Sequence, residues 1–520
     1  METAARVAPE RAVQRSSVHP QAPRWHIPAL MAGVAALALW RLNNGIDLGD
    51  EGFMAHCTAR VMEGQVPHRD FYSLQGPLSS MILAGWSKVV GLSFLKLRVL
   101  GALIHGGMVL LTYLIARRVS DPRWALAAGA ASIIIGLPHM RFAPLAVWQG
   151  LALSMLTVWL ALRSVQDGNR KLAFASGITA SLSLLVRHDQ GAYMVLSILV
   201  LAAATRWVGR ARFNLLAWIA GALCVGLPAF LIARATGALS GMWEQLVLFP
   251  LTRYGGTSSI PFPSLDQAGP AGSPLAFLFF RLTPLVALAA LPLIAWRLIR
   301  GFRGMPEAIG LFLSAWSLLM FGQVMVRSDL AHLVLTMHPL LVLVAWLAHY
   351  LRHALDWSSR WPSVASGAGA LGFAVITALS IRMFLPPWER DATRIESRFA
   401  SVVDEDGAEI NSVIKAIESD SGPDDAVLVL PYHPAYYVLA DRRNPTRWGY
   451  HWPGDRTDEE LKELIAQAEV DRPRAVVIFD RDSPATFLGP VVQWVEAHYS
   501  AIDTHADPVI YRQRNEVSLP

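Results

Sequence analysis

Cysteine and charge are both scarce in this chain. Its 520 residues include only two cysteines, Cys57 and Cys224, and 16% are charged. One cysteine in a predicted loop and one inside an apolar run neither build a disulfide framework nor match a metal-ligand spacing. The low charge, 53% hydrophobic residues and 18 tryptophans give more apolar surface than one soluble core can bury. The composition therefore predicts a multispanning membrane protein.

The amino-terminal segment lacks the features of a signal peptide. Residues 1–25 are largely polar and contain several arginines, and no small-residue cleavage site precedes the first apolar run at residues 27–42. A signal peptide would also have a shorter apolar core. We interpret residues 1–25 as a retained cytoplasmic tail and the following run as a transmembrane helix.

Ten further apolar runs follow up to residue 385, which predicts about eleven transmembrane helices over residues 26–385. An odd number places the two termini on opposite sides of the membrane. Arginines gather on alternate connections, which by the positive-inside rule lie in the cytoplasm with the amino-terminal tail. The basic residues thus set orientation, and we expect no nucleic-acid partner. The basic connections are residues 117–123, 163–171, 206–212, 297–303 and 352–360.

The composition changes after residue 386 to that of a soluble α/β domain. We expect an extracytoplasmic domain over residues 386–520. It contains no Gly-rich phosphate loop, no Cys/His metal pattern and no nucleophile elbow, so we interpret it as accessory to catalysis. Tyr432 and its aromatic neighbours could stack on a sugar or acceptor, or pack in the core. The predicted strands are residues 426–430 and 475–479, and the predicted helices are residues 459–470 and 491–498.

Two adjacent carboxylates, Asp50 and Glu51, open a predicted helix in the first outer loop, residues 43–96. Carboxylates are costly at the apolar edge of the bilayer, so their position asks for a reason. In one interpretation Asp50 caps the helix, whose positive end favours a carboxylate. In the other, one carboxylate is a general base that deprotonates an acceptor hydroxyl or amine, while the other positions substrate or tunes the first. The residues alone leave both open.

The order of features in this loop resembles the first outer loop of GT-C membrane glycosyltransferases. The resemblance is strongest to the branch with protein O-mannosyltransferases, lipid A aminoarabinose transferases and RgtA/B/C/D-like proteins. It rests on Asp50-Glu51, a helix ending in Glu63-Gly64, then Asp70, and Gly76-Pro77-Leu78 in place of a Pro-Pro-Leu stretch. The resemblance implies a GT-C-like, α-helical multispanning fold with Asp50 as catalytic base and Glu51 as its neighbour.

One feature of that branch is missing. Several members carry a second acidic residue in the short outer loop before the fourth span, where this sequence has no carboxylate over residues 139–142. A second acid, if the reaction needs one, must come from elsewhere on the same face. Asp70, Asp189 and Asp329 are the candidates.

Two arginines lie in short connections on this outer face. Arg187 precedes Asp189, and Arg327 precedes Asp329. Each pair could be no more than a solvated turn with an internal ion pair. The resemblance implies a polyprenyl-phosphate sugar donor, however, and Arg187 and Arg327 could bind its phosphate in bidentate fashion.

Two more residues are candidates for the same site. His332 could orient Asp329 or bind a metal, or it could be an ordinary hydrogen-bonded residue near a helix start. Tyr254 lies in the long connection of residues 236–273, which we expect to be either a mobile lid over the donor or disordered.

These observations predict an integral glycosyltransferase of the inner or plasma membrane. It would transfer a hexose or pentose from a polyprenyl-phosphate donor to a cell-envelope glycan, lipid or protein on the outer face, with inversion. No cofactor is required by the sequence, and a divalent cation is left open. A lipid or glycan flippase is an alternative that would show paired halves with broken helices. A non-catalytic scaffold is another, and it would leave Asp50 dispensable.

Overall fold

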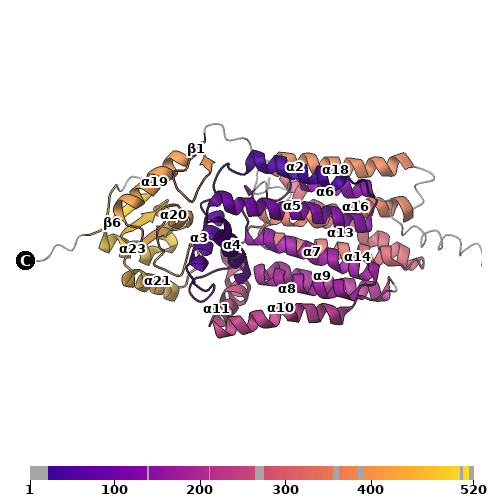
Figure 1. Cartoon of the computed structure of the whole chain (residues 1–520), viewed down its shortest axis with the longest axis horizontal. Helices are drawn as coiled ribbons and strands as arrows, with labels where there is room; N and C mark the ends of the chain where they lie inside the picture. Colours follow the sequence, from indigo (N-terminus) through magenta and orange to yellow (C-terminus); the bar gives the residue numbers. More distant parts are fainter. Residues whose placement is uncertain are drawn as a thin grey trace, which may run out of the picture.

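Long apolar helices run side by side through most of the chain (Figure 1). The computed structural model describes residues 22–137, 140–209, 211–263, 274–354, 362–384, 392–503 and 507–514, so most of the predicted tail lies outside the described residues. Each of the eleven predicted apolar runs contains one long helix, although the ends of several runs are not helical. The helices are α2 (His26–Arg41), α5 (Phe94–Val119), α6 (Pro122–Ser132), α7 (Ala146–Asp167), α8 (Arg170–Val186), α9 (His188–Trp207), α10 (Leu215–Ala235), α13 (Pro274–Ile299), α14 (Met305–Val326), α16 (Met337–Ala354) and α18 (Pro362–Phe384).

Six of these helical runs are long and apolar enough to cross a membrane, within the described residues. They lie in α5, α7, α10, α13, α14 and the run that joins α15 (Leu330–Leu333) to α16. α2 and part of α18 are shorter apolar helices. A multi-pass membrane protein is confirmed, while the count of eleven crossings stays a prediction.

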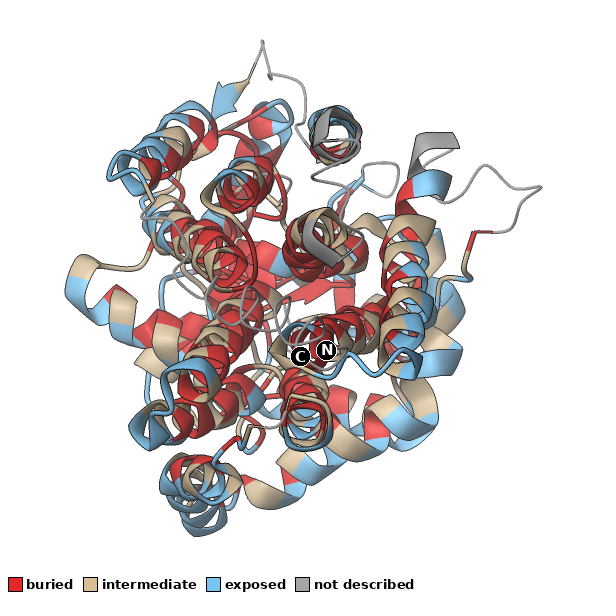
Figure 2. Cartoon of the chain, turned by 90° about the vertical axis from the view of Figure 1, so that its right-hand side faces the viewer, coloured by how far each residue is buried: buried red, intermediate tan, exposed pale blue. Residues whose placement is uncertain are grey.

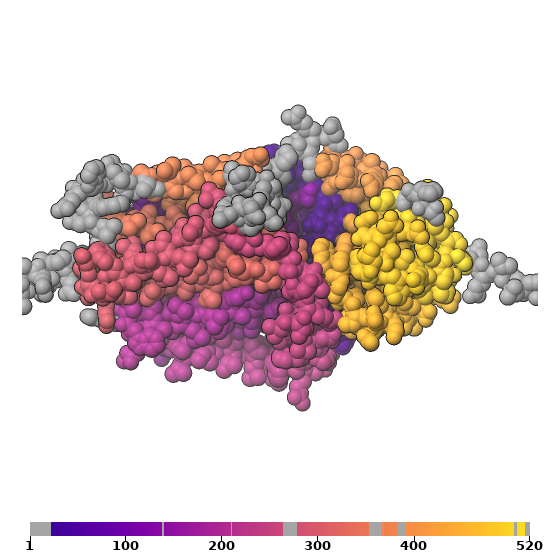
Figure 3. All heavy atoms as spheres, turned by 180° about the vertical axis from the view of Figure 1, so that it is seen from behind, coloured from indigo at the N-terminus to yellow at the C-terminus, as the bar shows by residue number. Residues whose placement is uncertain are grey.

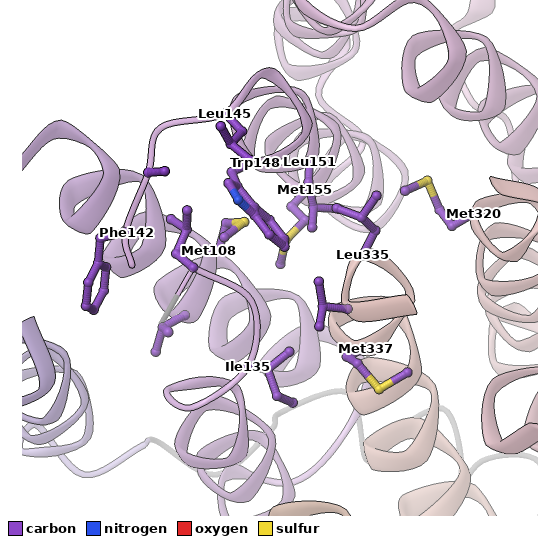
Figure 4. Packing of buried hydrophobic residues seen from close by; sticks show 14 of the residues in the cluster. Met108, Ile135, Phe142, Leu145, Trp148, Leu151, Met155, Met320, Leu335 and Met337 are labelled. Carbon is purple, nitrogen blue, oxygen red and sulfur yellow. The ribbon is translucent and has the colours of Figure 1, made fainter. Parts of the chain in front are cut away.

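Buried residues lie toward the inside of the bundle and exposed ones toward its outside (Figure 2). Trp148 and Met155 of α7 pack between Met108 of α5 and Leu335 of the short 3₁₀ turn η3 (Val334–Thr336), as Figure 4 shows. Methionine is unbranched and fills irregular gaps between helices. On α10, by contrast, Leu216, Leu223, Leu227, Phe230 and Leu231 are exposed, as expected of a face that meets lipid.

The basic connections meet at one end of the bundle. Arg118 in the last turn of α5 donates to Asp167, the last residue of α7, over 2.7 Å, and Arg352 in the last turn of α16 lies 3.8 Å from Asp121. The structure therefore brings alternate connections together, as the charge pattern predicts. Which end is cytoplasmic stays a prediction.

The opposite end carries the first outer loop, with helices α3 (Asp50–Met62) and α4 (Pro77–Val90). The predicted helix after Asp50 is confirmed, and it ends before Gly64, whose φ of +89° favours glycine. α3 packs against α20 (Ala435–Leu439) of the carboxyl-terminal region. A Cβ on Gly52 would lie 2.5 Å from the backbone nitrogen of Ala435, so this contact requires a glycine.

The carboxyl-terminal region forms an α/β unit beside α3 and α4 (Figure 1). Its sheet has the order β3-β4-β6-β5, with β3 (Val427–Leu430) parallel to β4 (Ala475–Ile478) and β6 (Val509–Gln513) antiparallel to both β4 and β5 (Tyr499–Ala501). The two predicted strands and two predicted helices are confirmed. These two helices are α21 (Asp458–Val470) and α23 (Gly489–His498). The remaining elements are β1 (Thr393–Arg394), β2 (Val403–Asp404), α19 (Gly407–Asp420) and α22 (Asp482–Phe487).

The connection after α10 is mostly helical from Leu239 to Thr257, so the expected disorder is wrong there, while the lid stays a prediction. Pro250 begins a π-helical turn, a position that needs no backbone N–H donor. The segment is tied on both sides, because Gln245 bonds to His68 over 2.9 Å and Arg253 pairs with Glu460 at 2.8 Å. Its elements are α11 (Leu239–Trp243), the π-helices η1 (Glu244–Leu248) and η2 (Pro250–Tyr254), and α12 (Gly255–Thr257).

Candidate active site

Asp50 is the first residue of α3, but its side chain does not cap that helix. Gly49 occupies the capping position without a side-chain bond. Instead, Asp47 Oδ1 accepts hydrogen bonds from the backbone N–H groups of Gly49 and Asp50, at 2.9 and 3.0 Å. Asp47 thus forms the turn that starts the helix. The capping interpretation of Asp50 is wrong, and its carboxylate is left for another purpose.

The surroundings of Asp50 raise its pKa. The side chain is accessible to water although protein surrounds it on most sides, and that crowding raises its pKa to about 6. The negative charges of Asp47 and Asp329 raise the pKa as well, while Arg327 and His332 lower it. A carboxyl with this pKa is ionised at neutral pH yet binds a proton far better than an ordinary aspartate.

Arg327 and Asp329 follow α14 and are held in a compact turn. Arg327 Nε donates to Asp329 Oδ2 at 2.5 Å, and Nη1 donates to the carbonyl of Ser258 at 3.3 Å. Asp329 Oδ1 accepts from the backbone of His332 and lies 2.7 Å from its Nδ1. Burial opposes the change, but the bonds from His332 and Arg327 lower the pKa of Asp329 to about 2. His332 is therefore hydrogen-bonded to Asp329, as both the orienting role and an ordinary hydrogen-bonded residue require.

Arg187 and Asp189 form a similar pair between α8 and α9. Arg187 Nε donates to Asp189 Oδ1 at 2.9 Å. Burial lowers the pKa of Arg187, but the charges of Asp189, Tyr254 and Asp50 outweigh burial and raise it. Arg187 thus lies within electrostatic reach of Asp50.

Tyr254 lies within electrostatic reach of both arginines. Burial raises the pKa of its hydroxyl, and the charges of Arg187 and Arg327 both oppose that rise. The structure therefore brings seven of the nine predicted site residues into one electrostatic cluster, which we call the outer charged cluster. Its members are Asp50, Arg187, Asp189, Tyr254, Arg327, Asp329 and His332.

Glu51 has different surroundings from Asp50. It is buried, and its two oxygens accept from Nε and Nη2 of buried Arg98 at 2.6 and 2.7 Å. Arg98 also donates to the carbonyls of Leu42, Asn44 and Gly45. This pair ties the start of the outer loop to α5, so Glu51 holds the loop in place rather than facing Asp50.

Asp70 also lies in another setting. It pairs with Arg69 at 2.7 Å and accepts from the backbone of Val66, which closes a local turn. The bond from Arg69 lowers the pKa of Asp70. This is the ordinary environment of a surface turn.

The carboxyl-terminal domain contributes to the site in a way the sequence did not reveal. The Arg327 guanidinium lies 5.6 Å from the centre of the Trp452 ring, and Phe53 of α3 meets Tyr450 edge-on at 4.8 Å. Figure 3 shows the amino-terminal part in indigo between the membrane helices and this domain. The run Trp448-Gly449-Tyr450-His451-Trp452 is the signal that could have found these residues, because dense aromatics in a connection often mark a binding surface.

Metal ligands are not grouped at this site. Across the described residues, no three His, Cys, Asp or Glu side chains are placed so that they could hold a metal ion.

The fold defines the class of protein. The long helices, the outer loop with α3 and α4, and the α/β domain at the same end form the GT-C fold, so the resemblance drawn from the sequence is confirmed at the level of fold. No known protein-family model matches the sequence, and no curated protein sequence matches it.

Two solved structures are similar over nearly the whole chain. One is ArnT from Cupriavidus metallidurans bound to undecaprenyl phosphate, with a TM-score of 0.56, 14% identity, and 95% of this chain and 99% of that chain covered. The other is the archaeal oligosaccharyltransferase AglB from Archaeoglobus fulgidus, in complex with an inhibitory peptide and a dolichol-phosphate. Its TM-score is 0.52 at 12% identity, with 96% of this chain and 75% of that chain covered.

Proposed function

We propose that this protein is a membrane glycosyltransferase that transfers a sugar from a polyprenyl-phosphate donor to a cell-envelope acceptor. One observation carries the proposal. Asp50, a carboxylate with a raised pKa, lies within electrostatic reach of two arginines, Arg187 and Arg327, that come from other connections of the same end of the bundle.

Asp50 is the general base of the proposed reaction. At neutral pH its carboxylate accepts the proton of an acceptor hydroxyl or amine as that group attacks the anomeric carbon. The new glycosidic bond forms as the bond from the anomeric carbon to the phosphate oxygen breaks, and the lipid phosphate leaves with the bonding electrons. A single displacement of this kind inverts the configuration.

Arg187 and Arg327 neutralise the leaving phosphate. In the part of the chain that the structure describes, Arg187 donates to Asp189 through Nε, which leaves its Nη groups for a ligand. Asp189 and Asp329 fix the planes of the two guanidinium groups, and planar paired N–H donors suit a phosphate. Tyr254 lies beside both and covers the donor. That ArnT binds undecaprenyl phosphate and AglB binds a dolichol-phosphate on the same fold supports a lipid-linked donor.

The remaining assignments follow from the layout. The domain of residues 386–520 lies on the same end as Asp50, so we place both outside the cytoplasm. Glu51 is a positioning residue, and Asp70 is not a member of the site. A hexose or pentose is transferred to a glycan, lipid or protein of the cell envelope.

The test is a transfer assay on purified protein in lipid nanodiscs, with synthetic polyprenyl-phosphate hexoses and pentoses as donors and envelope extract as acceptor. We expect the wild type to release polyprenyl phosphate and to glycosylate a component visible by mass spectrometry. The Asp50→Asn variant should remain folded, and its transfer rate should fall by a factor of about 10² to 10⁴.

Asp70→Asn is the matched comparison, since Asp70 is a carboxylate of the same outer loop outside the outer charged cluster. It should keep near wild-type transfer. Full activity in Asp50→Asn together with loss of activity in Asp70→Asn would show that Asp70, and not Asp50, is the general base. Absence of donor turnover by the wild type with every donor would favour a flippase or scaffold.

A further inference from the structure

Three aromatic side chains of the carboxyl-terminal domain gather next to Arg327. The Tyr432 ring lies 4.8 Å from Trp452 and 6.3 Å from Phe487, stacked on the latter with 18° between the planes. All three are partly exposed. We call Tyr432, Trp452 and Phe487 the aromatic platform.

The platform lies at the edge of the core of its domain, against which Phe487 packs. Tyr436 and Tyr437 are buried, and the Tyr437 hydroxyl accepts from the backbone N–H of Val429 in β3. For these two the packing interpretation holds. Tyr432, by contrast, is only partly buried.

A polar group lies at the edge of the platform. Asp455 is 2% exposed, and its Oδ1 has no hydrogen-bond partner among the described residues. Its backbone N–H donates to the carbonyl of Trp452 at 3.0 Å, and its charge reaches Tyr432. The Thr257 side chain bonds to the Asp455 carboxylate, and the charges of Arg456 and Arg253 favour its ionised form, so Asp455 belongs to the buried support of the platform.

Partly exposed aromatic faces suit a particular ligand. A pyranose ring has an apolar C–H face, which packs on the electron-rich face of an aromatic ring, and hydroxyls at its edge. Trp452 lies next to the Arg327 guanidinium, whose charge acts on Asp50, so a ring on the platform lies near the proposed reacting centre.

We propose that the aromatic platform is a carbohydrate subsite that stacks one pyranose ring. The inference rests on the proposed function and deepens it. The ring belongs either to the donor sugar or to the acceptor glycan, and both present the same stacking face.

Paired substitutions test stacking against simple packing. Trp452→Phe and Tyr432→Phe keep an aromatic face, whereas Trp452→Leu and Tyr432→Leu keep apolar bulk without one. In the nanodisc assay we expect each Leu variant to raise one KM about 2- to 10-fold at nearly unchanged kcat, and each Phe variant to stay near wild type.

The KM that rises identifies the sugar. An increase for polyprenyl-phosphate hexose assigns the platform to the donor, and an increase for envelope extract assigns it to the acceptor. Phe399→Leu is the control, because Phe399 is a partly buried ring of the same domain beside Arg398 instead of Arg327. Leu and Phe variants with both KM values at wild-type level would overturn the subsite, while an inactive wild type would overturn the proposed function instead.

A measurement on wild-type protein covers the case in which the Leu variants fail to fold. Hydroxyl-radical footprinting should show Trp452 and Tyr432 protected by polyprenyl-phosphate hexose or by envelope extract, and less by polyprenyl phosphate alone. Phe399 should be oxidised equally in all samples. Equal oxidation of Trp452 with and without the sugars would refute the subsite.

Discussion

Neighbouring groups shift the pKa of Asp50 in opposite directions. Crowding by protein and the carboxylates of Asp47 and Asp329 favour the protonated form, whereas Arg327 and His332 favour the ionised form. The resulting pKa is about 6. A carboxyl with a pKa just below neutral pH is mostly ionised there and still accepts a proton readily, as a general base must.

The pH profile of transfer should report this value. Because the base acts in its ionised form, we expect kcat/KM to rise about tenfold per pH unit below pH 6 and to level off above pH 7. Arg327 lowers the pKa of Asp50. Arg327→Ala should therefore move the rising part of the pH profile to higher pH, while Arg327→Lys should leave it in place. A limb near pH 4 in the wild type would mean that the base is an ordinary aspartate.

The neighbouring Glu51 should respond differently to the same kind of substitution. Glu51→Gln removes the charge that compensates buried Arg98, and breaking a buried pair in this way typically costs about 3 to 5 kcal/mol. We expect its melting temperature in detergent to fall by several degrees, while Asp50→Asn melts like the wild type.

The exposed pair of Lys415 and Glu396 supplies the control, because surface ion pairs contribute little. Glu396→Gln should leave the melting temperature nearly unchanged. Equal melting of Glu51→Gln and wild type would show that the pair with Arg98 does not hold the outer loop.

At the residue scale the sequence could single out Asp50, Arg187 and Arg327 as candidates, because charges at the ends of apolar runs are rare and expensive. It could not separate the roles of Asp50 and Glu51. Their difference comes from Arg98, which lies 47 positions further along the chain and meets Glu51 only in the folded protein.

The site is assembled from connections between elements rather than from any single element. α14 and α8 each end at an arginine whose Nε is bound by an aspartate two residues later. The repeated arrangement turns two short connections into two oriented guanidinium groups. A planar fork is the property that distinguishes arginine from lysine at such positions.

Replacement of either arginine should therefore weaken use of the donor. Arg187→Lys and Arg327→Lys keep the charge but lose bidentate geometry, and we expect the KM for polyprenyl-phosphate hexose to rise about tenfold, with larger losses for Ala. Arg118→Lys, in the ion pair with Asp167 at the opposite end, should behave like wild type. Wild-type KM values in both Ala variants would remove the two arginines from the donor site.

At the element scale, periodicity was sufficient for the long helices and for β3 and β4. It failed for the segment from α11 to α12, where Gly255, Gly256 and Pro250 indicate a loop and tertiary contacts impose helical turns. The contribution of Trp452 was also beyond reach, because it depends on how the carboxyl-terminal domain docks on α3.

The whole molecule has two different ends. One end carries Arg118, Asp167, Asp121 and Arg352, whose ion pairs join the connections after α5, α7 and α16. The other carries the outer charged cluster and the α/β domain (Figure 1). The structure fixes which connections share an end, and only the distribution of arginine assigns that end to a compartment.

Reporter fusions test this assignment for the molecule as a whole. Because basic connections stay in the cytoplasm, a reporter after Gln166 or Arg303 should be active as a cytoplasmic fusion, and one after Thr257 or Pro520 as an extracytoplasmic fusion. Gln166 and Thr257 lie at opposite ends of the bundle, so they must give opposite signals whatever the orientation, which provides an internal control. A cytoplasmic signal at both Thr257 and Pro520 would show that the protein has the opposite orientation in the membrane. Asp50 would then face the cytoplasm, and transfer to an acceptor on the outer face would be impossible.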